Sequence, residues 1–87
     1  MPRVQIPALL RELTNGQDMV VVPGETVGQV IENLDQSFPG IKGRLCYGNK
    51  LRKNLSLVID GKLNQRGITQ TVSEKSVIRF IPAISGG

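Results

Sequence analysis

Alternation of apolar and polar residues predicts the strands of this chain. Four segments show the pattern of a strand: residues 3–6, 18–22, 55–60 and 77–81. Asp60-Gly61 favours a two-residue hairpin turn, because both positions tolerate positive φ, and it leads into a short edge strand at 62–65. Pro82 is expected to end the last strand and to detach the final residues from the sheet, because proline lacks the N–H that a strand ladder uses.

The clearest helix is predicted between the second and third strands. Thr26 followed by Gln29 matches a capping box, in which the hydroxyl and the amide each satisfy a backbone N–H. The apolar residues after the cap form one stripe on a helix of about three turns: Val27, Val30, Ile31, Leu34 and Phe38. Pro39-Gly40 ends this helix.

Two further segments carry weaker signals. Pro7 suits the first position of a short helix whose leucines follow at helical spacing, and Asn15-Gly16 supplies a stop. Residues 40–54 hold three glycines and no sustained period, so they are interpreted as a surface connection with room for one short turn.

This order of elements predicts an α+β fold, a mixed twisted sheet with one main helix across one face. The ubiquitin-like β-grasp arrangement satisfies it, with the first and last strands parallel at the sheet centre and a right-handed crossover. Residues 1–82 would form the β-grasp domain and residues 83–87 a flexible tail. Ile81 and Arg79 should face away from the helix. The side chains expected to face the helix are Val4, Ile6, Leu57, Ile59, Ile78 and Phe80.

Composition narrows the chemistry. The 87 residues allow one domain, and with three aromatic residues its core must be aliphatic. No apolar run approaches the ~20 residues of a membrane span, and no signal peptide is visible. The chain has no His and one Cys, which excludes an intrachain disulfide and a Cys/His metal site and fits a reducing cytoplasm. A self-contained enzyme is therefore disfavoured.

Cys46 and the net charge of +4 do not change this interpretation. Cys46 would need a lowered pKa to act as a nucleophile, and it is interpreted as buried or idle. The excess of Lys and Arg forms no long block, so it is interpreted as a mildly basic, solvated surface.

The last residues carry the strongest candidate chemistry. Ser85, Gly86 and Gly87 offer almost no side chain, so a partner could close a narrow channel around their backbone and reach the Gly87 carboxylate. A carboxylate is a poor electrophile, and an acyl-adenylate is a reactive one. The chain has no phosphate-binding loop of its own, so a separate ATP-using enzyme is implied. The competing interpretation is an ordinary frayed terminus.

The sequence resembles the ThiS/MoaD family of ubiquitin-like sulfur carriers along its whole length. The resemblance is carried by residues 4–14, by the capped helix and by residues 77–87, which end Pro-Ala-Ile-Ser-Gly-Gly. Ile6-Pro7 and this ending are most similar to the CysO-like branch, which carries sulfur for cysteine synthesis. The resemblance implies that an E1-like enzyme, using ATP and zinc, adenylates Gly87. A sulfur donor then forms a thiocarboxylate, which a sulfur-accepting synthase uses.

The same resemblance implies the site residues, and it implies no metal or cofactor in this chain. Gly87 would be modified, Gly86 would be threaded with it, and Ala83, Ile84 and Ser85 would form the arm that enters the partner. Ile81, and less strongly Val58, would form the docking surface. The acceptor could instead be a molybdopterin precursor, a thiazole precursor of thiamine or a tRNA base.

Two other classes of function stay open. The cations of the 40–54 segment are dense enough to cover several phosphates of a nucleic acid: Lys42, Arg44, Lys50, Arg52 and Lys53. Single-strand binders usually stack bases on aromatic residues, however, and only Tyr47 lies nearby. A ubiquitin-like modifier, joined to lysines through Gly87, would share the activation chemistry.

Overall fold

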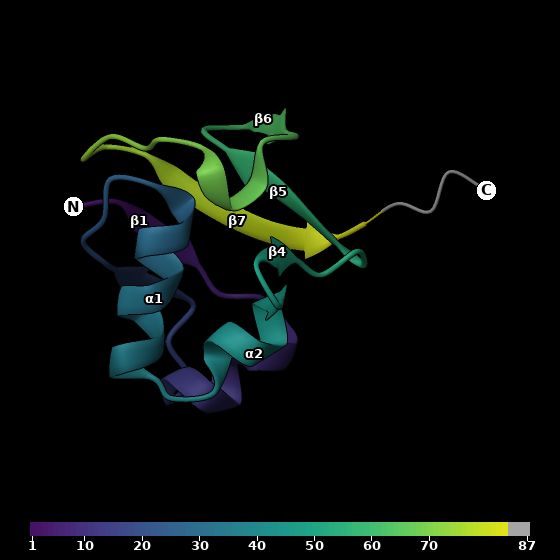
Figure 1. Ribbon diagram of the computed structural model, residues 1–87. Coiled ribbons are helices and arrows are strands. Elements are labelled where there is room, and N and C mark those ends of the chain that lie inside the picture. Colours follow the sequence, from purple (N-terminus) through teal and green to yellow (C-terminus); the bar gives the residue numbers. More distant parts are fainter. Residues whose placement is uncertain (84–87) are drawn as a thin grey trace.

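A five-stranded mixed sheet forms the frame of the computed structural model, which describes residues 1–83 (Figure 1). The strands lie in the order β2-β1-β7-β5-β6. Strands β1 and β7 pair in parallel, and every other neighbouring pair in this sheet is antiparallel. The predicted α+β fold and the central parallel pair are confirmed. The bounds are β1 Arg3–Gln5, β2 Met19–Val21, β5 Leu55–Ile59, β6 Lys62–Asn64 and β7 Val77–Pro82.

The main helix, α1 (Val27–Ser37), crosses one face of this sheet (Figure 1). Thr26 Oγ1 accepts a hydrogen bond from the Gln29 N–H at 3.1 Å, as the capping box predicts. The return bond differs from the prediction, because Gln29 Oε1 accepts from the N–H of Glu25, one residue before the cap, at 2.9 Å. Both bonds still satisfy backbone donors at the helix start.

Replacing Thr26 with Ala should lower the free energy of unfolding by about 1 kcal/mol, because the capping acceptor is lost. Thr26→Ser is the matched control and should keep most of the stability. Urea denaturation followed by circular dichroism measures both variants. Equal midpoints for Thr26→Ala and the unaltered chain would show that this cap contributes nothing.

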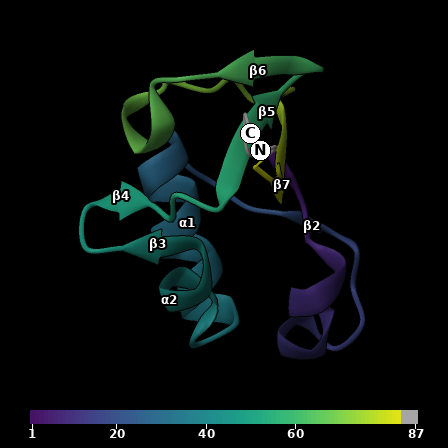
Figure 2. The ribbon, with the colours of Figure 1, turned by 90° about the vertical axis from the view of Figure 1, so that its right-hand side faces the viewer.

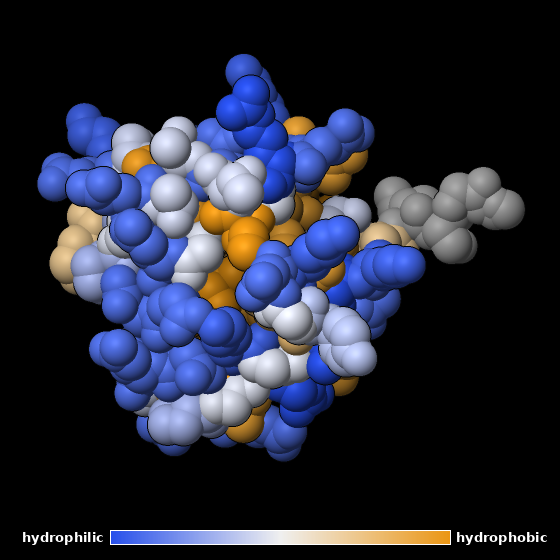
Figure 3. Space-filling model, viewed as in Figure 1, coloured by the Kyte–Doolittle hydropathy of each residue, from blue (hydrophilic) through white to orange (hydrophobic). Residues whose placement is uncertain are grey.

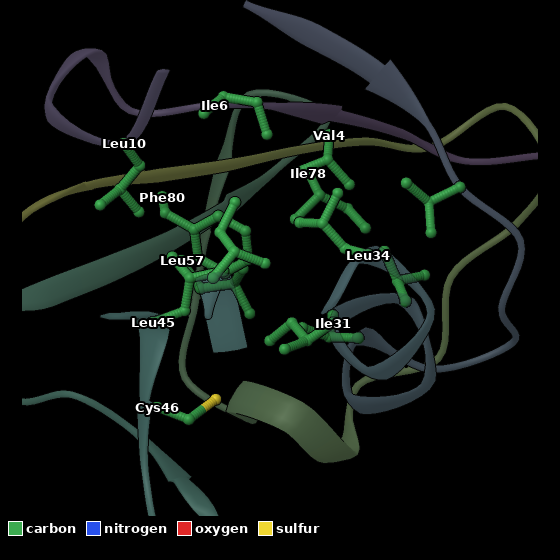
Figure 4. Close-up of a cluster of buried hydrophobic side chains, with 14 residues drawn as sticks. Val4, Ile6, Leu10, Ile31, Leu34, Leu45, Cys46, Leu57, Ile78 and Phe80 are labelled. Carbon is green, nitrogen blue, oxygen red and sulfur yellow. The ribbon is translucent and has the colours of Figure 1, made fainter. Parts of the chain in front are cut away.

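The core lies between α1 and the sheet (Figure 4). Val4, Ile6, Leu57, Ile78 and Phe80 are buried there as predicted, and Ile59 is half-buried at its edge. The helix stripe supplies four more buried residues, Val27, Val30, Ile31 and Leu34. In Figure 3 the outer side of α1 is hydrophilic, whereas apolar surface gathers near the short 3₁₀ helix η2 (Gly67–Thr69).

The prediction of a surface connection over residues 40–54 was wrong. This segment forms helix α2 (Ile41–Leu45) and a small hairpin of β3 (Cys46–Tyr47) and β4 (Lys50–Leu51). Ile41 and Leu45 are fully buried, since residues four apart share one face of a helix. Asp35 Oδ1 fixes the turn into α2 by accepting from the N–H groups of Gly40 and Lys42, at 3.1 and 3.0 Å.

The predicted stop of the short helix and the predicted hairpin turn are both confirmed. The short helix is a 3₁₀ helix, η1 (Ala8–Thr14), which Asn15 ends in the left-handed conformation. Pro7 stands at its N-cap, one position earlier than predicted. Asp60 and Gly61 have φ values of 51° and 82°, as the hairpin turn requires.

The last strand runs one residue further than predicted. Pro82 pairs in register with Leu55, and the N–H of Ala83 donates to the Asn54 carbonyl oxygen at 2.8 Å. The Leu55 N–H donates to the carbonyl oxygen of Arg52 and not to β7, so Leu55 and Pro82 form a pair without hydrogen bonds between them. A proline, which has no N–H, fits this position of the strand. The expectation that Pro82 detaches the chain was therefore wrong for Ala83.

Candidate functional site

Ala83 is the last described residue of the predicted arm, and it lies half-buried at the end of β7. Its N–H donates to the carbonyl oxygen of Asn54, the residue before β5, so Ala83 is still held at the end of the sheet. The predicted residues Ile84, Ser85, Gly86 and Gly87 lie outside the described residues.

The predicted docking residues Val58 and Ile81 lie close together on the sheet face opposite α1. Val58 pairs with Arg79, and Ile81 is two residues further along β7, opposite Ser56. Diagonal neighbours of this kind are about 7–8 Å apart. Both side chains are half-buried, so each retains surface for a partner.

Leu63 enlarges this surface, although it was not among the residues predicted from the sequence. It pairs directly with Val58 on edge strand β6, and it is 65% exposed. The alternation of Lys62, Leu63 and Asn64 would by itself have placed Leu63 toward the core; only the register with β5 shows that it faces outward. We call Val58, Leu63, Arg79 and Ile81 the outer sheet patch; it combines three aliphatic side chains with one cation.

The cations of the 40–54 segment are partly engaged within the fold. Lys42 forms an ion pair with Glu32, whose carboxylate raises the pKa of Lys42. Arg52 donates from Nε and Nη2 to the Gly43 carbonyl oxygen at 3.0 and 2.8 Å, and its guanidinium lies 5.8 Å from the centre of the Tyr47 ring. These contacts leave fewer free cations for phosphates than the sequence alone indicated.

Cys46 is buried, as predicted. Its side chain joins the core cluster, with 7% of the residue exposed (Figure 4). Burial raises the pKa of the Cys46 thiol, and the nearby charge of Lys42 opposes this only in part. The thiolate, which is the reactive form, is therefore disfavoured.

Alkylation should reveal this protection. Iodoacetamide near neutral pH should modify Cys46 in the folded chain at least about tenfold more slowly than in urea, because the thiol is both buried and less ionised. The folded-state rate should still be rising at pH values where the rate of the unfolded chain has already levelled off, because the pKa of the folded thiol is higher. Time courses by intact mass measure both rates, and equal rates would contradict the burial argument.

Neither a membrane span nor a metal cluster occurs in the part of the chain described. Between residues 1 and 83, no helix is long and apolar enough to cross a membrane. Over the same residues, no three His, Cys, Asp or Glu side chains gather as metal ligands.

The sheet order, the crossing helix and the central parallel strands define a ubiquitin-like β-grasp protein. The ThiS family model matches residues 4–87, and the chain belongs to this family. The sulfur carrier protein CysO of Mycobacterium tuberculosis is 29% identical over 89 residues, which cover 97% of this chain and 96% of the relative. The resemblance inferred from the sequence is thus confirmed.

Solved structures agree with this assignment. A chain of the Amycolatopsis orientalis BexX/CysO complex matches with a TM-score of 0.90 and 28% identity, covering all of both chains. Mycobacterium tuberculosis CysO matches with a TM-score of 0.88 and 27% identity, covering 97% of this chain and all of the other. The small archaeal modifier protein 1 of Methanosarcina acetivorans shares the fold, with a TM-score of 0.78, 24% identity and coverage of 99% and 95%.

Proposed function

We propose that this chain is a sulfur carrier whose C-terminal Gly87 becomes a thiocarboxylate and donates sulfur in biosynthesis. The observation that carries the proposal is the family match, which extends to Gly87. Similarity to sulfur carrier proteins over nearly the whole chain supports it. Gly87 is the reacting residue in this proposal, and the rest of the chain positions it.

The chemistry has two steps. The Gly87 carboxylate attacks the α-phosphorus of ATP, which gives an acyl-adenylate and pyrophosphate. A sulfur nucleophile then attacks the acyl carbon, and the carbon–oxygen bond to AMP breaks. With sulfide as the donor, the products are the thiocarboxylate and AMP. One oxygen of the original carboxylate leaves with AMP, and no oxidant is required.

The chain acts as a substrate and not as the catalyst. It has no phosphate-binding loop and no His to serve as a general base. The adenylating enzyme is therefore an E1-like partner, and ATP and zinc belong to that enzyme. The complex of a related carrier with BexX supports the idea that such carriers act through partner proteins.

We assign cysteine synthesis as the pathway, on the similarity to CysO. A sulfur-accepting synthase would then take the sulfur from Gly87 onto an activated serine derivative. Molybdopterin, thiamine and thiolated tRNA are the alternative products. Incubating the loaded carrier with each class of acceptor enzyme distinguishes them by which one consumes the thiocarboxylate.

The outer sheet patch is the docking surface for the activating enzyme in this proposal. Burial of its aliphatic side chains would contribute roughly 25 cal/mol per Å² before the costs of association. Ile81 lies nearest to the tail, so it would be covered whenever a partner encloses residues 83–87.

Replacing Ile81 with Asp should raise the carrier concentration needed for half-maximal loading by about tenfold, as expected when an interface anchor is lost. Val21→Asp is the control, because Val21 is exposed at the far edge of the same sheet and should load normally. Steady-state pyrophosphate release measures loading. Thermal melting of both variants checks the fold, and a large drop confined to Ile81→Asp would place Ile81 in the core instead.

The direct test of loading uses the purified chain, the activating enzyme from the same organism, ATP and sulfide. Intact-mass analysis should show one oxygen replaced by sulfur, and omission of ATP should prevent the change. An unchanged mass with an enzyme that is active on its own ATP substrate would refute the proposed function.

A further inference from the structure

An apolar groove flanked by two arginines lies beside the point where β7 ends. Helix α2 and the purple helix η1 lie next to each other below the ends of β5 and β7 (Figure 2). The groove between these helices and the strand ends has a volume of about 690 Å³. Leu10 and Phe80, both part of the core, form its apolar wall, and Leu9 lines it while remaining 84% exposed. The groove therefore offers an apolar surface that the described chain leaves open.

The charged side chains that line the groove are both positive. Arg44 and Arg52 line it, and none of its described lining residues is acidic. The hydrogen bonds from Nε and Nη2 of Arg52 to the Gly43 carbonyl oxygen orient the guanidinium, and its Nη1 group has no hydrogen bond within residues 1–83, so it can still donate to a carboxylate. An apolar wall next to two cations fits a ligand that carries an aliphatic side chain and a nearby carboxylate.

The chain itself ends in such a ligand. Pro82 lines the groove, and four residues follow Ala83, enough to reach about 13–14 Å when extended. Phe80 and Pro82 alternate onto the groove side of β7, and the same alternation continued would bring Ile84 to that side. Because Pro82, Arg44 and Arg52 line the same groove, a tail of this length that folds back along it would bring the Gly87 carboxylate to the arginines.

We propose that this groove is a resting site for the chain's own C-terminus, with Ile84 against the apolar wall and the Gly87 carboxylate beside Arg44 and Arg52. The proposal rests on the free terminus of the proposed function. Because the tether holds the ligand at millimolar effective concentration, a weak affinity is enough to fill the groove. An activating enzyme that takes the tail then competes with the groove for it.

Amide NMR signals of isotope-labelled protein test this site without any partner enzyme. The signals of Ala8, Leu9 and Arg44, which lie across the groove from the new terminus, should differ between the full chain and a variant ending at Ala83, and the difference should not change with protein concentration. Coinciding groove signals in the two proteins would overturn the proposal. A concentration-dependent difference would also overturn it, since the occupant would then be the tail of a second copy.

A peptide supplies the second arm of the test. Ala-Ile-Ser-Gly-Gly added to the variant ending at Ala83 should move the same signals back toward their positions in the full chain. The peptide with a C-terminal amide should bind about fivefold more weakly, as should the acid peptide to a further Arg44→Glu variant. Lys62→Glu, an exposed charge reversal on β6, is the matched control and should bind normally. Equal binding of acid and amide peptides would overturn the role of the arginines.

The outcomes separate this inference from the proposed function. A chain that never acquires sulfur would refute the carrier proposal and leave the NMR result fully interpretable. A chain that loads normally but shows no change in groove signals would refute only the resting site.

Discussion

Removing Gly87 should abolish sulfur loading while leaving the unfolding transition unchanged. The shortened chain still ends in a carboxylate, on Gly86, but that group lies about 3.5 Å short of its place in the activating enzyme. A misplacement of about 1 Å can already cost 100-fold in rate, so we expect a loss of at least about 100-fold. The core comprises residues between 4 and 80, so stability should not depend on Gly87. Pyrophosphate release and thermal melting measure the two effects.

A variant with one Gly added after Gly87 tests whether the position of the carboxylate matters and not only the loss of a residue. It restores bulk and flexibility at the end but moves the carboxylate one residue too far, so it should also prevent loading. Wild-type rates for either variant would show that Gly87 is not the reacting residue. A melting temperature well below that of the full chain would show instead that the tail is part of the fold.

Replacing Ile41 with Ala should be the most destabilising of the substitutions considered for this chain. Ile41 is fully buried at the start of α2, and truncation of such a side chain costs about 2–5 kcal/mol. A domain of this size has a total stability of only about 4–13 kcal/mol. The melting temperature should therefore fall by roughly 8 °C or more. Chemical denaturation and calorimetry measure the loss.

Gly43→Ala, in the same helix, is the control. A Cβ at Gly43 meets no neighbouring atom within 4 Å, so this variant should be neutral or stabilised by up to about 1 kcal/mol. If Ile41→Ala proved as mild as Gly43→Ala, the 40–54 segment would be a surface connection after all, and its place in the core would be wrong.

The elements that could be predicted from sequence are those long enough to show a period. Helix α1 repeats its apolar stripe over three turns, and β5 and β7 alternate over five and six residues. Helix α2 has five residues and two apolar positions, and β3 and β4 have two residues each, so none contains a full repeat. Their structure depends on packing against α1 and the rest of the core, which local pattern does not encode.

The residues of the candidate site also divide into those that a local pattern could place and those that depend on contacts between distant segments. Val58 and Ile81 could be placed on one face because alternation within a strand fixes which residues point outward. Leu63 was missed because its membership of the outer sheet patch depends on the register between β5 and β6. The groove could not be predicted at all, since η1, α2, β5 and β7 contribute to it from distant parts of the chain.

Mass spectrometry of the C-terminal peptide from the protein's own cells tests the central claim most directly. Trypsin cleaves after Arg79 and releases residues 80–87 as one fragment. The account predicts that part of this fragment carries sulfur in place of one oxygen of the Gly87 carboxylate. A fragment found only as the ordinary acid, or only joined through Gly87 to lysines of other proteins, would contradict it.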